Sequence, residues 1–123
     1  MEESENWLKQ AEADLRTSEN SLKSQDFYAS VFWSQQSAEK ALKSFIINNE
    51  GKLIKIHDLV ILGRRARLPE DLLLKCEKLS LAYTNTRYGI SDNEIPSKKF
   101  KENDAVNFLN IAKGVLEWLR KKI

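Results

Sequence analysis

The chain contains little of three residue types that mark other fold classes. In 123 residues, cysteine occurs once, at Cys76, proline occurs twice and glycine four times. One cysteine excludes an intramolecular disulfide bond and any zinc site built on cysteine pairs. An all-β chain needs many turns, and turns need glycine and proline, so their scarcity argues against that class.

The chain also lacks an excess of charge and a long apolar run. Lysine and arginine number 20 against 18 acidic residues, and a net charge of +2 is too small to indicate nucleic-acid binding by itself. No apolar run approaches the roughly 18 residues of a membrane span, and the acidic start MEESENWLKQ is unlike a secretory signal. We therefore expect a soluble, cytoplasmic protein with a single domain over residues 1–123.

The apolar residues recur with a period of about 3.6, which predicts helices and no strands. We expect four long helices, at residues 4–24, 26–49, 70–87 and 103–122, and one short helix between residues 58 and 68. Capping or stop residues stand at the expected ends: Ser4, Asp26, Gly51, Asp58 and Pro69. The polar segment YGISDNEIPSKKFKEN predicts a long exposed connection. The predicted fold is all-α, an up-and-down antiparallel helical bundle.

The helix expected at residues 26–49 is apolar on two sides. Its main stripe consists of Phe27, Val31, Ala38, Leu42 and Phe45, and Ala29, Trp33 and Ile47 lie on the opposite side. This pattern is typical of a helix at the centre of a bundle, or of one that also faces another subunit. Trp33 and its neighbour on that side, Gln36, are therefore interface candidates.

His57 is the only histidine of the chain, within KIHDLVIL. A histidine can act as a general base or a metal ligand. One histidine without clustered carboxylates or cysteines makes a poor metal site, so the favoured interpretation is that His57 shapes the start of the short helix.

Asp14 stands beside Leu15 at the edge of an apolar stripe. A carboxylate there must reach water or meet a partner, because burying it alone is costly. Two interpretations stay open. Asp14 either lies in a polar pocket that faces a cation such as Arg87, or points outward at the edge of the helix.

Two adjacent glutamines divide between the two sides of the same helix. Gln35 falls within the apolar arc, where we expect its amide to form hydrogen bonds inside the bundle. Gln36 falls on the other side with Lys40 and Lys43, so we expect the two glutamines to serve different purposes. Gln36 and the lysines either bind an anion or form an ordinary solvated face, and the second is commoner. Glu39 and Lys43 have the i, i+4 spacing of a weakly stabilising pair.

Arg87 and Tyr88 end the helix expected at residues 70–87, just before the long connection. An arginine near a helix C-terminus interacts favourably with the helix dipole, which needs no further role. Its planar fork of donors also suits a phosphate group. The basic clusters at residues 64–67, 98–101 and 120–122 are interpreted as solvated surface.

Five short motifs, taken together, carry a family resemblance. The first is a tryptophan followed by A-x-x-D-L in WLKQAEADL. The others are QQSAEKALKSF, HDL, the tyrosine and RY of AYTNTRYG, and the DA of ENDAVNFLNIAK. In this order, over nearly the whole chain, they resemble the HEPN domain family, small helical proteins of prokaryotes whose domain also occurs in higher eukaryotes.

The resemblance implies a bundle that is commonly a homodimer and is frequently encoded beside a small nucleotidyltransferase. Some members are metal-independent ribonucleases that act as toxins of toxin–antitoxin pairs. These carry an arginine followed, after four to six residues, by a histidine, and two copies form the site in the dimer. Here Arg87 is followed at that distance by Asp92, Asn93 and Glu94, and His57 lies upstream on another segment. Because imidazole is the usual proton carrier near neutral pH, this departure argues against RNA cleavage.

The resulting hypothesis is a non-catalytic HEPN protein that dimerises, acts with a nucleotidyltransferase and could bind a nucleotide. Resemblance and residue type place the ligand site at Arg87 and Tyr88, with Asp14 and Gln35 nearby and Lys40 and Lys43 as phosphate contacts. The sequence has no glycine-rich phosphate loop, and we expect no metal or cofactor. Two alternatives stay open: a ribonuclease toxin that uses Arg87 with a carboxylate, and a helical interaction module without a small-molecule ligand.

Overall fold

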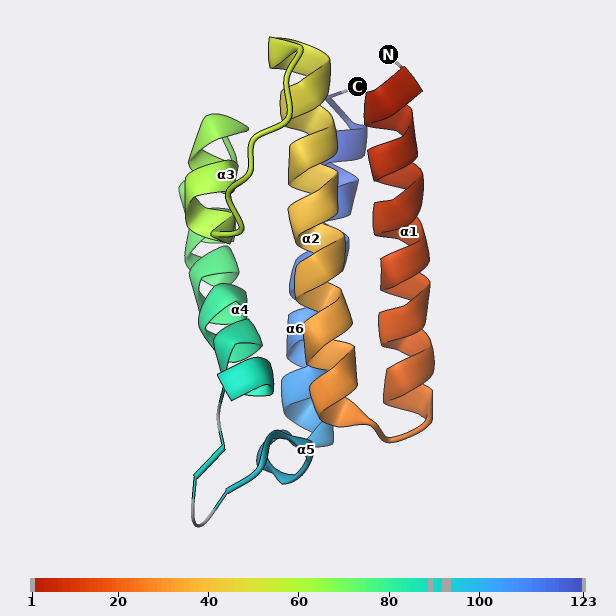
Figure 1. Ribbon diagram of the computed structural model, residues 1–123, viewed down its shortest axis with the longest axis vertical. Helices are drawn as coiled ribbons and strands as arrows, with labels where there is room; N and C mark the ends of the chain where they lie inside the picture. The colour runs from red at the N-terminus through yellow and green to blue at the C-terminus, as the bar shows by residue number, and fades with distance from the viewer. Residues whose placement is uncertain (1, 89, 92–93, 123) are drawn as a thin grey trace.

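The computed structural model describes residues 2–88, 90, 91 and 94–122, and within them all regular structure is helical. The helices are α1 (Glu2–Lys23), α2 (Phe27–Glu50), α3 (Leu59–Arg65), α4 (Glu70–Tyr88), α5 (Pro96–Lys99) and α6 (Glu102–Arg120). Figure 1 shows α1, α2, α4 and α6 running alternately up and down, with both chain ends at the same end of the bundle. The predicted all-α antiparallel bundle is confirmed.

Two of the predicted end signals work as expected. The Asp58 carboxylate accepts hydrogen bonds from the amides of Val60 and Ile61, at 2.8 and 3.3 Å, and caps α3. Gly51 has a φ of 75°, and its amide donates to the carbonyl of Ile47 at the end of α2. That left-handed conformation is strained for a residue with a side chain, so glycine ends the helix there.

Of the other end signals, Ser4 was wrong and Asp26 was right in position only. Ser4 was expected to cap the first helix, but α1 begins at Glu2, so Ser4 is buried inside the first turn. Asp26 does hold the N-cap position of α2, but its side chain makes no capping hydrogen bond.

The connection after Arg87 is shorter than the sequence predicted. Helix α4 continues through Tyr88, Pro96 starts the short helix α5, and α6 begins at Glu102. Proline suits a first helical position because no amide donor is needed there. Part of the predicted connection, residues 89, 92 and 93, lies outside the described residues.

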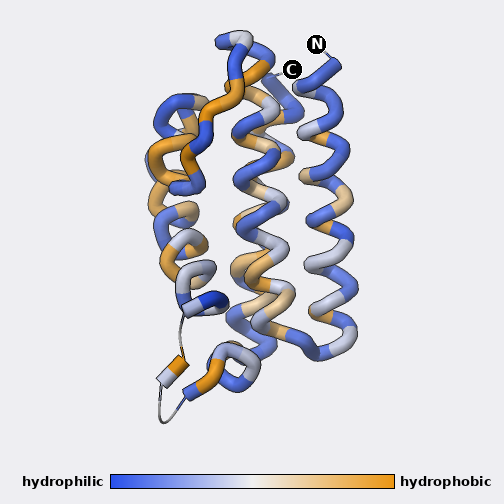
Figure 2. The backbone as a smooth tube through the Cα atoms, viewed as in Figure 1, coloured by the Kyte–Doolittle hydropathy of each residue, from blue (hydrophilic) through white to orange (hydrophobic). Residues whose placement is uncertain are grey.

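Helix α2 is the centre of the bundle, as its two-sided apolar pattern predicted. Val31, Ala38, Leu42 and Ile47 are completely buried, although Ile47 lies opposite the other three. Helices α1, α4 and α6 all contact α2. Figure 2 shows that hydrophobic residues also gather along the connection before α3, where the side chains of Ile54 and Ile56 pack against the core.

Helices α1 and α2 meet along a row of small polar residues. The buried serines of α2 are Ser30, Ser34, Ser37 and Ser44. The hydroxyl of Ser18, on α1, lies 2.8 Å from the Ser34 hydroxyl, and Ser37 donates to the carbonyl of Ala11 at 2.7 Å. Small side chains let the two backbones approach, and each hydroxyl finds a partner on the facing helix. We call this row the serine seam.

No helix in the described part of the chain combines the length and apolar character that crossing a membrane requires.

Candidate functional site

A chain of side-chain hydrogen bonds runs from the end of α4 to the middle of α2. Arg87 donates through Nη1 to the hydroxyl of Tyr83 at 2.9 Å. Gln36 contacts the same hydroxyl through Nε2 at 3.4 Å and donates to Oε1 of Gln35 at 3.0 Å. Gln35 in turn donates to Oε1 of Glu39 at 3.1 Å. We call these five residues the polar chain.

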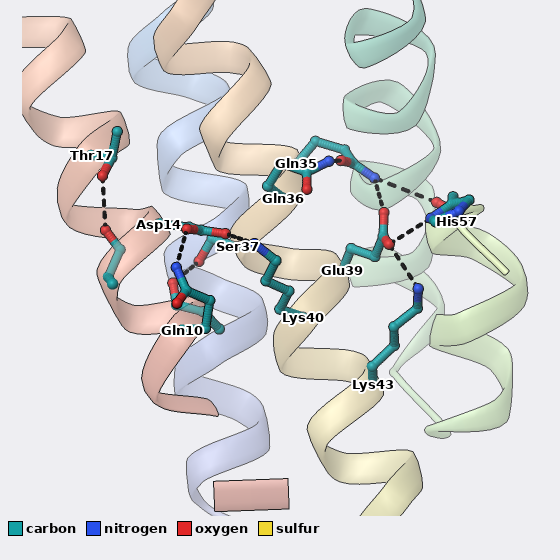
Figure 3. Close-up of polar contacts among 12 residues, drawn as sticks. Gln10, Asp14, Thr17, Gln35, Gln36, Ser37, Glu39, Lys40, Lys43 and His57 are labelled. Atoms are coloured by element: carbon teal, nitrogen blue, oxygen red, sulfur yellow. Dashed lines mark hydrogen bonds and ion pairs between the residues drawn. The ribbon is translucent and has the colours of Figure 1, made fainter. Parts of the chain in front are cut away.

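Glu39 ends the polar chain as a buried carboxylate with three donors. Its Oε2 lies 2.9 Å from Nζ of Lys43 and 2.8 Å from Nδ1 of His57, and Gln35 donates a hydrogen bond to Oε1. Burial by itself raises the pKa of this carboxyl, but the hydrogen bonds from Lys43, His57 and Gln35 outweigh burial and lower the pKa below its ordinary value. Glu39 is therefore charged at neutral pH. Figure 3 shows its contacts with Gln35, Lys43 and His57.

Lys43 does not lie on the solvated face that its helical position suggested. It is buried, with its ammonium paired to Glu39 and 5.8 Å from the centre of the Trp7 ring. Lys40 keeps part of its side chain in solvent, but its ammonium is paired with Asp14. Each ammonium therefore already has a buried carboxylate partner, which leaves less charge available for a phosphate group.

Asp14 lies in a polar pocket, and the cation that it faces is Lys40. The carboxylate is almost completely buried, with Nζ of Lys40 at 2.5 Å and Nε2 of Gln10 at 2.9 Å. The outward-pointing interpretation of Asp14 was therefore wrong, and so was Arg87 as the expected cation. Arg87 is bonded to Tyr83 instead.

His57 holds the connection before α3 against α2. Its ring is mostly exposed, yet Nδ1 contacts Glu39, and its backbone carbonyl lies 3.4 Å from Nε2 of Gln35. A carboxylate only accepts hydrogen bonds, so the contact with Glu39 suits an N–H donor at Nδ1. His57 was expected to shape the start of the short helix, but its contacts are to α2, and Asp58 provides the cap of α3.

Arg87 lies between two tyrosine rings at the open end of α4. Its guanidinium carbon is 5.6 Å from the centre of the Tyr83 ring and 5.1 Å from that of Tyr88. Its hydrogen bond to Tyr83 raises the pKa of the guanidinium. Among the described residues, no carboxylate forms an ion pair with Arg87. The Tyr83 ring also packs on Phe32, whose ring contacts Trp33 edge to face at 5.1 Å.

The six predicted ligand residues thus fall into two groups, and Figure 3 shows four of them, with Asp14 and Lys40 on one side of α2 and Gln35 and Lys43 on the other. Gln35 and Arg87 belong to the polar chain, with Lys43 attached through Glu39 and Tyr88 through the Arg87 guanidinium. Asp14 and Lys40 form a separate pair between α1 and α2. Gln36, expected to act apart from Gln35, is instead bonded to it.

Sequence reasoning missed two members of the polar chain. Tyr83 was noted only as the tyrosine of the motif AYTNTRYG and was given no role in the ligand site, although its i, i+4 spacing to Arg87 is a usable signal. Glu39 was predicted only as a weakly stabilising partner of Lys43, and the tertiary structure reveals that both are buried.

Two other kinds of chemistry find no support in the described residues. They contain no cluster of three metal-binding side chains. Cys76 is buried, and burial raises the pKa of its thiol to about 12, so it is not a nucleophile near neutral pH.

Comparisons with known proteins agree with one another. The sequence model of the HEPN domain family matches residues 4–122 of this chain. The crystal structure of TT1696 from Thermus thermophilus superposes with a TM-score of 0.90 at 28% identity, covering 100% of both chains. ST0689, an archaeal HEPN homologue, has a TM-score of 0.82 at 30% identity, covering 97% of this chain and 96% of its own. No curated protein matches the sequence significantly.

Proposed function

This chain belongs to the HEPN domain family, and we propose from that premise that it is a non-catalytic, homodimeric member which binds a nucleotide phosphate at Arg87. We further propose that it acts in the cytoplasm with a small nucleotidyltransferase, as the family resemblance implies.

The observation that carries the nucleotide proposal is the setting of Arg87. The guanidinium is solvent-exposed, and two tyrosines fix its position. Tyr83 accepts from one of its five N–H donors, which leaves others for phosphate oxygens. Tyr88 is 69% exposed, so its ring can stack on a base.

The absence of a histidine after Arg87 supports a non-catalytic role. The sequence carries Asp92, Asn93 and Glu94 where the ribonucleases of the family have histidine. His57 is bonded to Glu39 on α2. The alternative that pairs Arg87 with a carboxylate depends partly on Asp92, which lies outside the described residues.

Calorimetric titration with ATP tests the proposal. We expect the wild type to bind and Arg87→Ala to bind at least about tenfold more weakly, because a charged hydrogen bond contributes about 1.5–3 kcal/mol. Arg64→Ala is the matched control, since Arg64 is an exposed arginine on α3. Wild-type protein that binds no ATP at millimolar concentration contradicts the nucleotide part.

The same proteins separate the alternatives. RNA cleavage by the wild type that Arg87→Ala abolishes establishes the ribonuclease toxin instead. A complex with a co-expressed nucleotidyltransferase that survives Arg87→Ala and Tyr88→Ala, without ATP binding, establishes the ligand-free interaction module.

A further inference from the structure

Two adjoining hollows form a groove between α4 and α6. One has a volume of about 440 Å³ and the other about 380 Å³. Both are lined by Lys78, Asp104 and Phe108, so they adjoin at these three residues. The groove follows α4 from Leu72 to Asn85, which at 1.5 Å per residue is a length of about 20 Å. We call it the α4–α6 groove.

The floor of the α4–α6 groove is apolar and open. Leu72, Phe108 and Ile111 pack against the core but are only partly buried. Gly114 also lines the groove, and a Cβ placed there would meet nothing nearer than Cδ1 of Leu72 at 3.8 Å. Leu81, at the far end, is 64% exposed. Because Gly114 has no side chain and the neighbouring apolar side chains are only partly covered, the groove has space for another apolar group.

The charged side chains that line the α4–α6 groove give it a net positive charge. Lys75 and Lys78 are exposed on the α4 rim, and neither forms an ion pair with a described residue. On the α6 side, the Asp104 carboxylate accepts from the amide of Lys101 at the start of the helix and carries a single negative charge, so Lys75 and Lys78 leave the groove with a net positive charge. Acidic side chains are therefore attracted to this groove and basic ones are repelled.

We propose that the α4–α6 groove binds an acidic amphipathic helix of a partner protein. The apolar face of that helix covers Leu72, Phe108 and Ile111, and its carboxylates meet Lys75 and Lys78. A groove of about 20 Å accommodates about 13 helical residues. An added β-strand needs an exposed strand edge, and residues 2–88, 90, 91 and 94–122 contain no strand.

This proposal concerns a different surface from Arg87 and does not require nucleotide binding. The Arg87→Ala variant should bind the acidic helix as the wild type does, while the groove variants should bind ATP as the wild type does. A failure of either site is thus distinguishable from a failure of the other.

The probe is a hydrocarbon-stapled peptide of about 14 residues, with leucines at i, i+3, i+7 and i+10 and glutamates on both flanks. A second peptide carries lysine at every glutamate position. Fluorescence anisotropy with full-length protein should show binding of the acidic peptide at least about tenfold tighter than that of the basic one. Amide NMR shifts should concentrate at Phe108, Ile111 and Gly114.

Two sets of variants locate the binding. Lys75→Glu/Lys78→Glu should weaken the acidic peptide about tenfold or more and favour the basic one, whereas Lys9→Glu/Lys55→Glu, also exposed, should change neither. Gly114→Leu should fill the floor and weaken binding, and Gly114→Ala, which adds only a Cβ, is its control. If Gly114→Leu fails to fold, the Lys75→Glu/Lys78→Glu variant, which changes only exposed residues, still tests the proposal.

Three results overturn the proposal. One is equal binding of the acidic and basic peptides. Another is acidic binding that Lys75→Glu/Lys78→Glu leaves unchanged. The third is a wild-type self-association that Gly114→Leu abolishes and the acidic peptide cannot displace, which would make a second copy of this chain the occupant.

Discussion

At the scale of single residues, Glu39 links two segments of the bundle, α2 and the connection before α3, through one buried carboxylate. Lys43 and Gln35 come from its own helix and His57 from the connection before α3. A buried carboxylate with several donors is held in its charged form, and removal of the charge leaves the ammonium of Lys43 without its counterion. Glu39 is therefore a structural residue whose protonation should be visible in the stability of the fold.

Glu39→Gln should lower the free energy of unfolding by about 2 kcal/mol at pH 7, the scale of a lost charged hydrogen bond. The folded-state pKa of Glu39 is depressed, so its stabilisation is present above the unfolded pKa and is lost as the pH falls through the folded pKa. Urea unfolding between about pH 5 and pH 3 should therefore show a smaller loss of stability in Glu39→Gln than in the wild type.

Glu12→Gln is the control, because Glu12 forms an exposed ion pair with Arg120 at 2.9 Å. Exposed pairs contribute only about 0–1 kcal/mol, so this variant should stay close to the wild type at pH 7. A Glu39→Gln variant with the wild-type dependence of stability on pH would show that Glu39 does not carry this effect.

At the scale of elements, the serine seam explains how α1 lies against the central helix. The hydroxyl of Ser18 contacts the Ser30 hydroxyl at 3.0 Å and the Ser34 hydroxyl at 2.8 Å, and it donates to the Ser30 carbonyl. All three serines are completely buried. A buried hydroxyl without a partner is costly, so the contacts depend on one another.

Ser18→Ala should lower the free energy of unfolding by about 1–2 kcal/mol, because it removes a shared partner from two buried hydroxyls. Thr17→Ala is the matched control, since the Thr17 hydroxyl is exposed and bonds only within its own helix. Its effect should stay below about 0.5 kcal/mol. Equal effects of the two substitutions in urea unfolding would refute a specific role for the seam.

The helices were predictable because each long one repeats its apolar residues over several turns. Helices were expected at residues 4–24 and 26–49, and the structure has them at Glu2–Lys23 and Phe27–Glu50. Helix α5 is four residues long, too short to show a period. The serine seam was hidden because serine counts as polar, although its spacing on α2 follows the helix.

The candidate site was predictable only within one helix at a time. Helical position correctly placed Gln35 inside the bundle, where it is fully buried and hydrogen-bonded. The pairing of Asp14 with Lys40 and the contact of Gln36 with Tyr83 join different helices. Such contacts depend on the rotation and depth at which helices pack, which the pattern of one helix does not determine.

At the scale of the whole molecule, the exposed apolar residues near Arg87 bear on the proposed dimer. Tyr88, whose ring centre is 5.1 Å from the Arg87 guanidinium carbon, is 69% exposed, and Ile90, three residues after Arg87 in the sequence, is 71% exposed. A two-fold interface uses the same surface on both copies, so a dimer through this end brings the two Arg87 side chains near each other. Their repulsion opposes association unless an anion lies between them.

Nucleotide binding and dimerisation should therefore be coupled. In sedimentation equilibrium, ATP should shift the protein further from the 14.2 kDa monomer towards twice that mass, because a ligand that favours one state raises its population. Arg87→Ala should dimerise without ATP at least as well as the wild type and gain nothing from the nucleotide.

Tyr88→Ser/Ile90→Ser should weaken the dimer about tenfold or more, since each buried apolar side chain contributes about 1.5–3 kcal/mol. Ile61→Ser, at an exposed residue of α3, should not weaken it. If ATP leaves the wild-type dimer constant unchanged while still binding, the two Arg87 side chains do not share a ligand and the interface lies on another face, with the Trp33 side of α2 as the next surface to test.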